Sequence, residues 1–401
     1  MIEQHYEYAI IGGGLAAAHA VEGIRAHDTD GSIVLVAREP YLPYERPLLS
    51  KKLWTGQKQL PDIYPHDRSC YESMGVQLLL GQNVASLDVQ RKMLTLADGE
   101  EVGFGKLLLA TGGQPRRLPV PGGELEGVSY FRYLSDYLRL RGEAQEGSRA
   151  VVIGGGFIGS ELAAALTLNK VEVTMLFPEQ HLCARVFPAG LARAIDALYE
   201  ARGIRLLAGD TAVAIGQQQG RYTVRTGSGQ TLAADIVVAG IGIVPDVGLA
   251  QASGLAVSDG IDVDGQLCTS SPSVWAAGDV ARFPYVALGE RRRVEHWDNA
   301  VTMGHCAGEN MAGAGRVYDH MPYFYSDLFE FGYEAVGDID SRLDTFADWK
   351  QENDTGAIYY LKDGKVRGVM MCNLWDKVPL ARELIRHGKA VAPADLRGAI
   401  A

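Results

Sequence analysis

The sequence predicts an α/β fold made of two similar parallel-sheet domains and a smaller α+β domain near the C-terminal end. The first observation behind this prediction is an internal repeat, because Tyr8–Ala17 and Val151–Gly159 both read as a short apolar strand running into a glycine-rich turn. The second is that an alanine- and leucine-rich helix and another apolar strand follow each turn. The third is a set of strand-like segments after about residue 320, with an Asp-Gly turn at Asp363.

The two repeats share their spacing as well as their pattern. The first glycines of the turns, Gly12 and Gly154, lie 142 residues apart. Each second strand leads to an acid, Glu39 or Glu179, which follows its first glycine by 27 or 25 residues. This is the βαβ fingerprint of a dinucleotide site. One copy alone could be a glycine-rich turn without a ligand, but two copies in the same context favour two Rossmann-like dinucleotide-binding domains of the three-layer ββα type.

Each position in the fingerprint has a physical role. The first glycine makes the turn, the second lets the backbone approach a pyrophosphate, and a third small residue lets helix pack on strand. The helix N-terminus offers unpaired N–H groups to the phosphates, and the acid accepts hydrogen bonds from a ribose. The predicted cradle residues are Gly12, Gly14, Leu15, Ala16 and Ala17 in the first copy, and Gly154, Gly156, Phe157, Ile158 and Gly159 in the second.

The C-terminal segments predict the smaller α+β domain. Residues 357–361 and 366–372 read as strands, and residues 379–387 read as a helix. Earlier in the chain, residues 220–238 alternate polar and apolar side chains, which is typical of meander strands.

Composition narrows the function. The 401 residues carry a formal net charge of -11 and are 47% hydrophobic, so nucleic acid and anionic membranes are poor partners. No apolar run approaches the roughly 20 residues that span a bilayer, and the chain starts without a basic, signal-like region, so we expect a cytoplasmic protein. The five cysteines lie at least 38 residues apart, which argues against a metal site, an iron–sulfur cluster and an internal redox disulfide.

Three further segments resemble motifs of flavoproteins that bind two dinucleotides. These are Ala110-Thr111-Gly112-Gly113, the stretch Thr269–Asp279 that ends in Gly278-Asp279, and the stretch Ile236–Pro245 that contains Gly242. The resemblance implies FAD and NAD(P)H as cofactors. It also implies a discontinuous FAD-binding domain at 1–115 and 246–322, an NAD(H)-binding domain at 116–245 and a C-terminal domain at 323–401.

Four further segments resemble one branch of these flavoproteins in particular. Pro43–Lys51 resembles the PYxRPxLSK segment of oxygenase-coupled ferredoxin reductases and of apoptosis-inducing factor, and Arg291–Ala300, Ala307–Met311 and Tyr325–Leu328 are similar to the same branch. Leu176–Glu179 is closest to apoptosis-inducing factor. The resemblance covers nearly the whole chain.

The resemblance implies roles for individual residues. Lys51, held by Glu161, would place a cation near the flavin; the alternatives are a solvated lysine and a helix-surface acid. Phe157 would gate the nicotinamide pocket and Trp297 would lie over the ring systems, unless both are core aromatics. Arg46 would contact the FAD pyrophosphate. Asp279 would hold the ribityl chain, and His296 would contact a cofactor, with a structural histidine as an equal alternative. The other implied cofactor contacts are Arg38, Glu39, Val84, Ala110, Thr111, Gly112, Phe177, Glu179, Gly242, Gly278, Glu295 and Tyr325.

The sequence departs from the family pattern at several positions. Arg38 stands before Glu39 where the family has its acid, so either Glu39 holds the ribose of FAD or Arg38 packs over the adenine. Leu48 replaces a proline and Tyr325 replaces a tryptophan. The long insertion and the presequence of the mammalian protein look absent, which argues against death signalling or nucleic-acid binding.

Cofactor choice and acceptor follow from the same reasoning. Glu179 would accept from a ribose 2′-OH and repel a 2′-phosphate, so NADH is favoured over NADPH. The expected activity passes electrons from NADH through FAD to a ferredoxin- or rubredoxin-type carrier, with Arg291–Arg293 and Arg116-Arg117 as candidate docking residues. The alternatives are a slow, NADH-responsive redox sensor like apoptosis-inducing factor, and a reductase of a quinone, a radical or oxygen. We expect a monomer or a homodimer, whose assembly responds to redox state in the sensor alternative, and no nucleic-acid or membrane partner.

Overall fold

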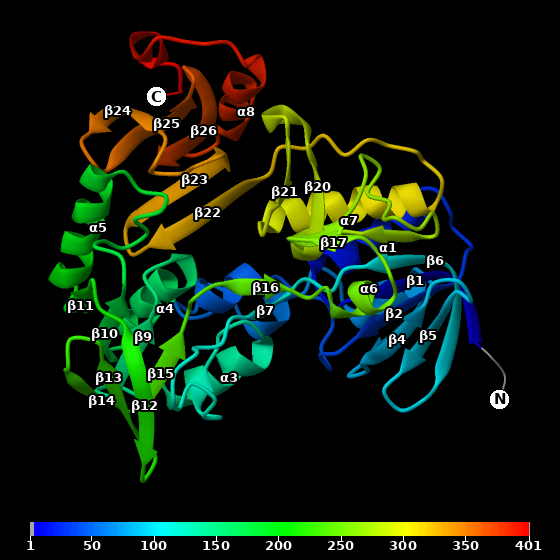
Figure 1. Ribbon diagram of the computed structural model, residues 1–401, viewed down its shortest axis with the longest axis horizontal. Helices are drawn as coiled ribbons and strands as arrows, with labels where there is room; N and C mark the ends of the chain where they lie inside the picture. Colours follow the sequence, from blue (N-terminus) through cyan, green and yellow to red (C-terminus); the bar gives the residue numbers. More distant parts are fainter. Residues whose placement is uncertain (1–3, 401) are drawn as a thin grey trace. The chain divides into compact units, whose positions relative to one another are not determined.

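The computed structural model describes residues 4–400, which form two compact units (Figure 1). Unit 1 joins residues 4–45, 60–114 and 245–323, and unit 2 joins Arg46–Gln59, Pro115–Val244 and residues 324–400. Each unit is therefore discontinuous in sequence and contains one of the two glycine-rich fingerprints.

Unit 1 is built on a seven-stranded sheet with the order β3-β2-β1-β6-β5-β4, in which β19 also pairs with β6. The strands β3, β2, β1, β6 and β19 are parallel to their neighbours, whereas β4, β5 and β6 form an antiparallel meander. β2 is a fully buried apolar run, and β1 and β6 each end in buried apolar residues, as expected for a sheet covered on both faces. The bounds are β1 (Gln4–Ile11), β2 (Ile33–Ala37), β3 (Val76–Leu80), β4 (Val84–Asp88), β5 (Met93–Leu96), β6 (Glu101–Leu109) and β19 (Val274–Ala276).

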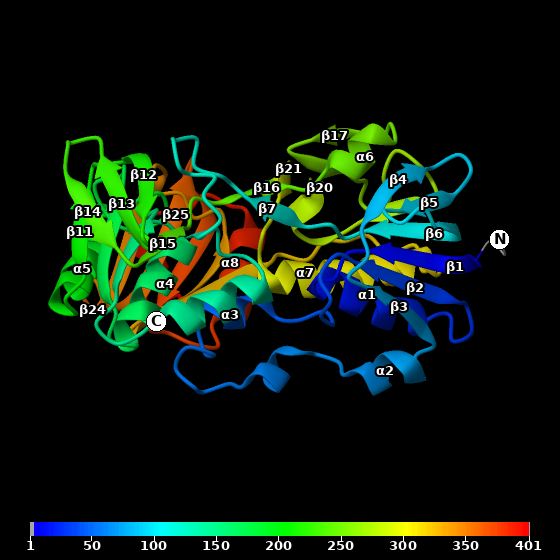
Figure 2. The same cartoon turned by 90° about the horizontal axis from the view of Figure 1, so that it is seen from below.

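Two helices of unit 1, α1 (Leu15–Arg25) and α7 (Trp297–Met311), pack with their backbones almost in contact (Figure 2). A Cβ on Gly304 would lie 2.3 Å from the Ala16 carbonyl oxygen, and one on Gly308 would lie 2.1 Å from that of Ala20. Only glycine permits this approach. The helix that begins at Trp297 is thereby packed against the helix of the first fingerprint.

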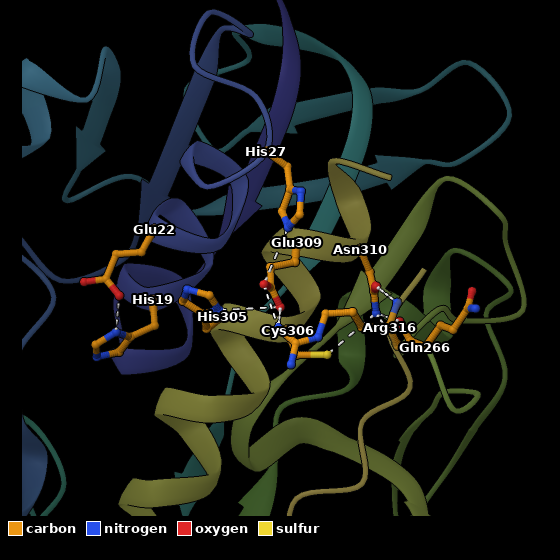
Figure 3. Close-up of polar contacts among 9 residues, drawn as sticks. All are labelled: His19, Glu22, His27, Gln266, His305, Cys306, Glu309, Asn310 and Arg316. Carbon is orange, nitrogen blue, oxygen red and sulfur yellow. Dashed lines mark hydrogen bonds and ion pairs between the residues drawn. The ribbon is translucent and has the colours of Figure 1, made fainter. Parts of the chain in front are cut away.

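A polar network fixes the C-terminal end of α7 (Figure 3). Arg316 Nη1 lies 2.8 Å from both carboxylate oxygens of Glu309, which is almost buried. The side chain of Asn310 accepts from the Arg316 backbone N–H at 2.6 Å and donates to the Arg316 and Gln266 carbonyls at 2.9 and 2.8 Å. The segment after α7 is therefore tied back to the helix by groups on both Glu309 and Asn310.

The remaining elements of unit 1 are short. A four-stranded sheet has the order β17-β18-β20-β21, and β21 carries the arginine run of residues 291–293. The elements are α2 (Arg68–Ser73), α6 (Gly248–Ala252), η2 (Leu60–Ile63), η3 (Gly278–Val280), η4 (Val286–Leu288), β17 (Val257–Ser258), β18 (Gly260–Asp262), β20 (Ala281–Tyr285) and β21 (Glu290–Arg293). The chain passes between the units after Glu45, Gln59 and Tyr323, and also within β7 (Gly113–Pro115) and β16 (Ile243–Pro245).

Unit 2 contains a parallel sheet of order β11-β10-β9-β15-β8 and an antiparallel sheet of order β12-β13-β14. Val151, Leu176 and Val237 of the parallel sheet share one hydrophobic core with Ile215 and Val224 of the antiparallel sheet. The bounds are β8 (Val128–Ser129), β9 (Arg149–Ile153), β10 (Glu172–Phe177), β11 (Arg205–Ala208), β12 (Ala212–Gln218), β13 (Arg221–Thr226), β14 (Thr231–Ala234), β15 (Ile236–Ala239), α3 (Leu134–Glu143), α4 (Phe157–Leu168), α5 (Ala189–Ala201) and η1 (Arg46–Ser50).

The C-terminal segment of unit 2 is an antiparallel sheet of order β22-β23-β26-β25-β24 with helix α8 packed on it. Hydroxyl groups tie it to the rest of the unit, because Tyr360 Oη donates to the Val186 carbonyl and Ser341 Oγ to the Ala184 carbonyl, both at 2.6 Å. The bounds are β22 (Tyr323–Leu328), β23 (Phe331–Gly337), β24 (Asp344–Gln351), β25 (Thr355–Lys362), β26 (Lys365–Cys372), α8 (Val378–His387) and η5 (Pro393–Leu396).

The predicted fold class is confirmed: two Rossmann-like parallel sheets and a C-terminal α+β segment are present. The two C-terminal strands and the helix expected from the sequence are β25, β26 and α8. Within residues 4–400, no helix combines the length and the hydropathy that crossing a membrane requires.

Candidate cofactor and reduction sites

The first glycine cradle connects β1 to α1 in unit 1. Gly12 has φ +138°, and a Cβ there would lie 2.1 Å from the Ala110 carbonyl oxygen, so the turn requires glycine. Gly14 is the N-cap of α1, and a Cβ there would meet nothing within 4 Å. Leu15, Ala16 and Ala17 follow as buried residues of the first helical turn.

The second cradle repeats this geometry between β9 and α4 in unit 2. Gly154 has φ +116°, and its Cβ would lie 2.4 Å from the Gly240 carbonyl oxygen. Gly156 is the N-cap of α4 and again has open space above it. Gly159 packs so closely that a Cβ would lie 2.1 Å from the Gly154 carbonyl oxygen.

Both cradles fit a pyrophosphate. Neither Gly14 nor Gly156 supplies a side-chain cap to the helix it precedes, so the first N–H groups of α1 and α4 remain available to a ligand. Open space directly above each N-cap glycine admits an anion to these donors. The chain thus has one cradle for a dinucleotide in each unit.

The end of β2 carries both residues proposed for the FAD adenosine. The Glu39 carboxylate accepts a hydrogen bond from Tyr44 Oη at 2.7 Å. Arg38 is half exposed, and its Nη1 lies 3.9 Å from the Asp246 carboxylate. Which of the two contacts the adenosine stays a prediction.

Asp246 joins the ATG segment to the strand that returns to unit 1, and the sequence analysis did not single it out. Its carbonyl accepts from Thr111 Oγ1 at 2.7 Å, its N–H donates to the Gly112 carbonyl at 2.9 Å, and its carboxylate accepts from Gln114 Nε2 at 2.8 Å. Because these partners lie more than 130 residues away in sequence, local patterns could not reveal the contact.

At the end of β10, Glu179 is the candidate ribose acceptor of the second site. Its carboxylate is 30% exposed and lies 3.4 Å from Arg185 Nη2, which is 88% exposed. An ion pair this open to water contributes little stability, so Glu179 keeps its capacity to accept hydrogen bonds.

A buried ion pair lies close to the second cradle. Lys51 Nζ is 2.8 Å from Glu161 Oε1, and the two side chains are only 8% and 4% exposed. Glu161 sits in α4, five residues after the N-cap Gly156. The pair expected from the family resemblance is therefore formed inside unit 2.

Two serines to which the sequence analysis gave no role complete this cluster. Ser50 Oγ donates to Glu161 Oε2 and Ser326 Oγ donates to Glu161 Oε1, both at 2.6 Å. Ser50 is next to Lys51 in sequence, but Ser326 is 165 residues from Glu161, so only the folded chain reveals it. A buried carboxylate with three donors is well satisfied.

Aromatic rings surround the same cluster. The Phe157 ring packs on Phe324 with centroids 5.2 Å apart, and Lys51 Nζ lies 5.3 Å from the centroid of the Tyr325 ring. Burial raises the pKa of Asp327, an effect that Lys51 opposes and Glu161 reinforces. Phe157 and Ile158, the first two residues of α4, stay partly exposed.

In unit 1, the candidate residues near the first cradle lie on η3 and at the start of α7. Gly278 has φ +78°, and a Cβ there would lie 3.0 Å from the Ala16 Cβ, so Asp279 follows a segment that abuts α1. Trp297 opens α7, and His296 is its N-cap. Burial lowers the pKa of His296 to about 4, so its ring is neutral at pH 7.

The other predicted contacts have these positions. Val84 begins β4, Ala110 follows β6, Phe177 ends β10, Gly242 has φ +93° before β16, and Glu295 is exposed ahead of α7 and paired with Arg293.

The arginine run 291–293, considered for docking, is paired with acids of unit 1. Arg291 lies 3.8 Å from Asp262, and Arg292 lies 2.6 Å from Glu290. Arg293 contacts Glu295 and Asp259. Acidic neighbours thus offset much of the positive charge of this run.

Arg46 and Arg117 stack on tyrosines. Arg46 donates to the Arg132 carbonyl at 3.1 Å and lies 5.5 Å from the Tyr133 ring centroid. Arg117 lies 4.4 Å from the Tyr130 ring centroid. Whether Arg46 also contacts a phosphate remains a prediction.

The five cysteines are distributed over both units. All five are free. Burial raises the pKa of Cys183 to about 12 and that of Cys306 to about 11, which keeps both as thiols at neutral pH. Among the described residues, no group of three or more His, Cys, Asp and Glu has a metal-binding arrangement.

Comparison with known proteins places the chain in a family. Residues 6–304 match the model of the pyridine nucleotide-disulphide oxidoreductases, and residues 307–355 match that of the C-terminal region of mitochondrion-associated apoptosis-inducing factor. The chain therefore belongs to the pyridine nucleotide-disulphide oxidoreductase family.

Similar proteins include enzymes and a protein named for apoptosis. Peroxisomal monodehydroascorbate reductase 4 of Arabidopsis thaliana is 36% identical over 385 residues, covering 90% of this chain and 78% of the relative. Mitochondrial apoptosis-inducing factor 1 of Dictyostelium discoideum is 33% identical over 428 residues, covering 97% and 80%.

Among solved structures, a chain of the covalent putidaredoxin reductase–putidaredoxin complex matches with a TM-score of 0.91 and 29% identity, over 98% of this chain and 95% of that one. The ferredoxin reductase for the CYP199A2 system of Rhodopseudomonas palustris matches with a TM-score of 0.90 and 31% identity, over 97% and 96%. The chain is thus a ferredoxin-reductase-like flavoprotein oxidoreductase that uses FAD and a nicotinamide nucleotide.

Proposed function

We propose that this protein oxidises NADH and passes the electrons, through FAD, to a one-electron carrier of the ferredoxin or rubredoxin type. The observation that carries the proposal is the buried Lys51–Glu161 pair beside an open dinucleotide cradle, in a chain whose other unit has a second open cradle. FAD, when bound, supplies the conversion of one hydride into two single electrons.

The chain's own residues bind and orient the cofactors in this proposal. The N-terminus of α1 binds the FAD pyrophosphate, and Asp279 holds the ribityl chain. The N-terminus of α4 binds the NADH pyrophosphate, while Phe157 and Trp297 pack against the ring systems. Lys51, held by Glu161, presents a fixed positive charge in a dry environment, where electrostatic stabilisation is strongest.

NADH rather than NADPH is proposed because of Glu179. Its carboxylate would accept hydrogen bonds from an adenosine 2′-OH but repel a 2′-phosphate. Arg185, the nearby cation, is almost fully exposed and can offset this repulsion only weakly.

A one-electron carrier as acceptor is supported by similarity to two reductases of known structure. One was solved in a covalent complex with putidaredoxin, and the other is the ferredoxin reductase for the CYP199A2 system. This acceptor is also supported by the buried, unpaired thiols Cys183 and Cys306, which offer no route to a disulfide.

Two alternative functions, reduction of a small acceptor and redox sensing, have specific support. The 36% identity to a monodehydroascorbate reductase favours a small radical as acceptor. The match of residues 307–355 to the apoptosis-inducing-factor region favours a slow redox sensor whose state, monomer or homodimer, follows its reduction.

Acceptor competition under anaerobic conditions tests the proposal. The holoprotein is reduced with one equivalent of NADH and mixed with an oxidised ferredoxin, with ascorbate radical or with buffer. The proposal expects rapid reoxidation with the ferredoxin. Rapid reoxidation only with the radical favours the small-acceptor function, whereas slow reoxidation by both, with a change in sedimentation on adding NADH, favours the sensor.

A further inference from the structure

We propose that Ser326, together with Ser50, is a positioning residue for the transfer of hydride from NADH: the two hydroxyls orient the Glu161 carboxylate, which in turn orients Lys51. This inference rests on the proposed function, since it concerns the reduction that NADH carries out. It assigns a role in that reaction to strand β22 of the C-terminal sheet.

The donors reach Glu161 from two segments of unit 2, because Ser50 and Lys51 are neighbours in sequence and Ser326 lies in the C-terminal segment. Lys51 and Ser326 approach Oε1 at 2.8 and 2.6 Å, and Ser50 approaches Oε2 at 2.6 Å. The hydroxyl distances fall in the range of charge-assisted hydrogen bonds. All four side chains are less than a tenth exposed, so water does not replace a lost donor readily.

The arrangement fixes the orientation of the carboxylate as well as its charge. The terminal torsion of a glutamate is broad, so one donor on one oxygen leaves the carboxylate plane free to turn. Donors on both oxygens, from chain segments that are themselves held, remove that freedom. Because Lys51 shares Oε1 with Ser326, a turn of the carboxylate would carry the ammonium group with it.

Three consecutive residues of β22 contact the three candidates for the reduction chemistry in unit 2. Phe324 packs on Phe157, Tyr325 lies against Lys51, and Ser326 donates to Glu161. The strand is an edge strand of the five-stranded sheet and pairs with β23, and hydrogen bonds from Ser341 and Tyr360 tie the same C-terminal segment to residues 184–186 of the unit. A strand in this position aligns the whole cluster.

A purely structural role of Ser326 would have a different effect on the kinetics of flavin reduction. If Ser326 only satisfied a buried carboxylate, its loss would lower stability but leave the limiting rate of reduction of the folded holoprotein unchanged. A positioning role lowers that rate while the binding of NADH stays the same, because the cradle of α4 does not depend on Ser326.

Stopped-flow reduction of the holoprotein by NADH separates the two roles. We expect Ser326→Ala to lower the limiting rate of flavin bleaching about tenfold, the order expected for one hydrogen bond to a charged group, with the NADH dissociation constant unchanged. Ser326→Thr, which keeps the hydroxyl, should recover most of the rate. Ser129→Ala is the matched control, because Ser129 is equally buried in unit 2 and its hydroxyl has no hydrogen-bond partner among the described residues.

A second measurement does not depend on activity. Urea denaturation of the holoproteins should show that Ser326→Ala lowers the midpoint in the wild-type background, and does so less when Glu161→Gln is already present. Ser50→Ala should behave in the same way from the other oxygen, and it keeps the inference testable if Ser326→Ala fails to fold.

The outcomes distinguish this inference from the proposed function. If NADH fails to bleach the wild-type flavin, the proposed function is wrong. If NADH bleaches the wild type and Ser326→Ala or Ser50→Ala is reduced equally fast, the function stands and the positioning role is refuted. Additive midpoint shifts in the cycle with Glu161→Gln would also contradict it.

Discussion

Removing the charge of Lys51 should destabilise the protein far more than removing the pair. In Lys51→Met, the Glu161 carboxylate stays 4% exposed, with the hydroxyls of Ser50 and Ser326 as its remaining donors. An unpaired buried charge of this kind costs about 3–5 kcal/mol of unfolding free energy. Since both side chains are less than a tenth exposed, screening by water reduces this figure little.

The double variant Lys51→Met/Glu161→Gln should lose much less. Glutamine keeps an acceptor for the serine hydroxyls and leaves no buried charge, so we expect a loss of about 1–2 kcal/mol, the cost of imperfectly paired buried polar groups. The adjacent Lys52 is exposed, and Lys52→Met should change stability by no more than about 0.5 kcal/mol.

Equilibrium urea denaturation of the holoproteins, followed by circular dichroism, measures these differences. The reasoning requires Lys51→Met to be less stable than the double variant. If Lys51→Met costs no more than Lys52→Met, or if the double variant is the least stable of the set, the buried carboxylate does not depend on Lys51 and the account of the pair is refuted.

Three further predictions concern cofactor choice, pH and thiols. Glu179→Ala should lower the preference for NADH over NADPH in kcat/KM by about tenfold, since one like-charge repulsion is removed; an unchanged ratio would exclude Glu179 from ribose recognition. Burial lowers the pKa of His296 to about 4 in the folded protein, whereas a histidine of the unfolded chain has a pKa of about 6.5. The unfolded chain therefore binds the proton more strongly, and the free energy of unfolding falls by up to about 3 kcal/mol as the pH drops from about 6.5 toward 4. His296→Gln should flatten that part of the urea-stability profile, and an unaltered profile would show that the ring titrates normally. Iodoacetamide at neutral pH should leave NADH-driven flavin reduction intact, because the buried thiols of Cys183 and Cys306 stay protonated; inhibition with labelling of either residue would contradict this.

The cradles could be predicted from the sequence because their information is local. Gly12, Gly14, Gly154 and Gly156 stand where a strand turns into a helix, and the structure gives each the backbone or the open space that the motif demands. Strand and helix positions followed for the same reason, from the burial of short apolar runs.

The remainder of the site needed the fold. The pairing of Lys51 with Glu161 came from family resemblance, since no spacing rule brings residues 110 positions apart together. Ser326 and Asp246 were missed because their hydrogen-bond partners are distant in sequence and come close only when the strands are arranged in the folded chain. The arginine run 291–293 was given too much weight in the sequence analysis. Glu290 and Glu295, which pair with Arg292 and Arg293, stand beside the run in sequence, whereas Asp262, which lies near Arg291, is distant in sequence.

Anaerobic stopped-flow mixing of the purified holoprotein with one equivalent of NADH tests the central claim most directly. The account predicts that the visible flavin absorbance bleaches in a single turnover, faster with NADH than with NADPH, and that Glu161→Gln slows this bleaching while FAD stays bound. A flavin that NADH leaves oxidised, or one reduced equally fast in Glu161→Gln, would contradict it.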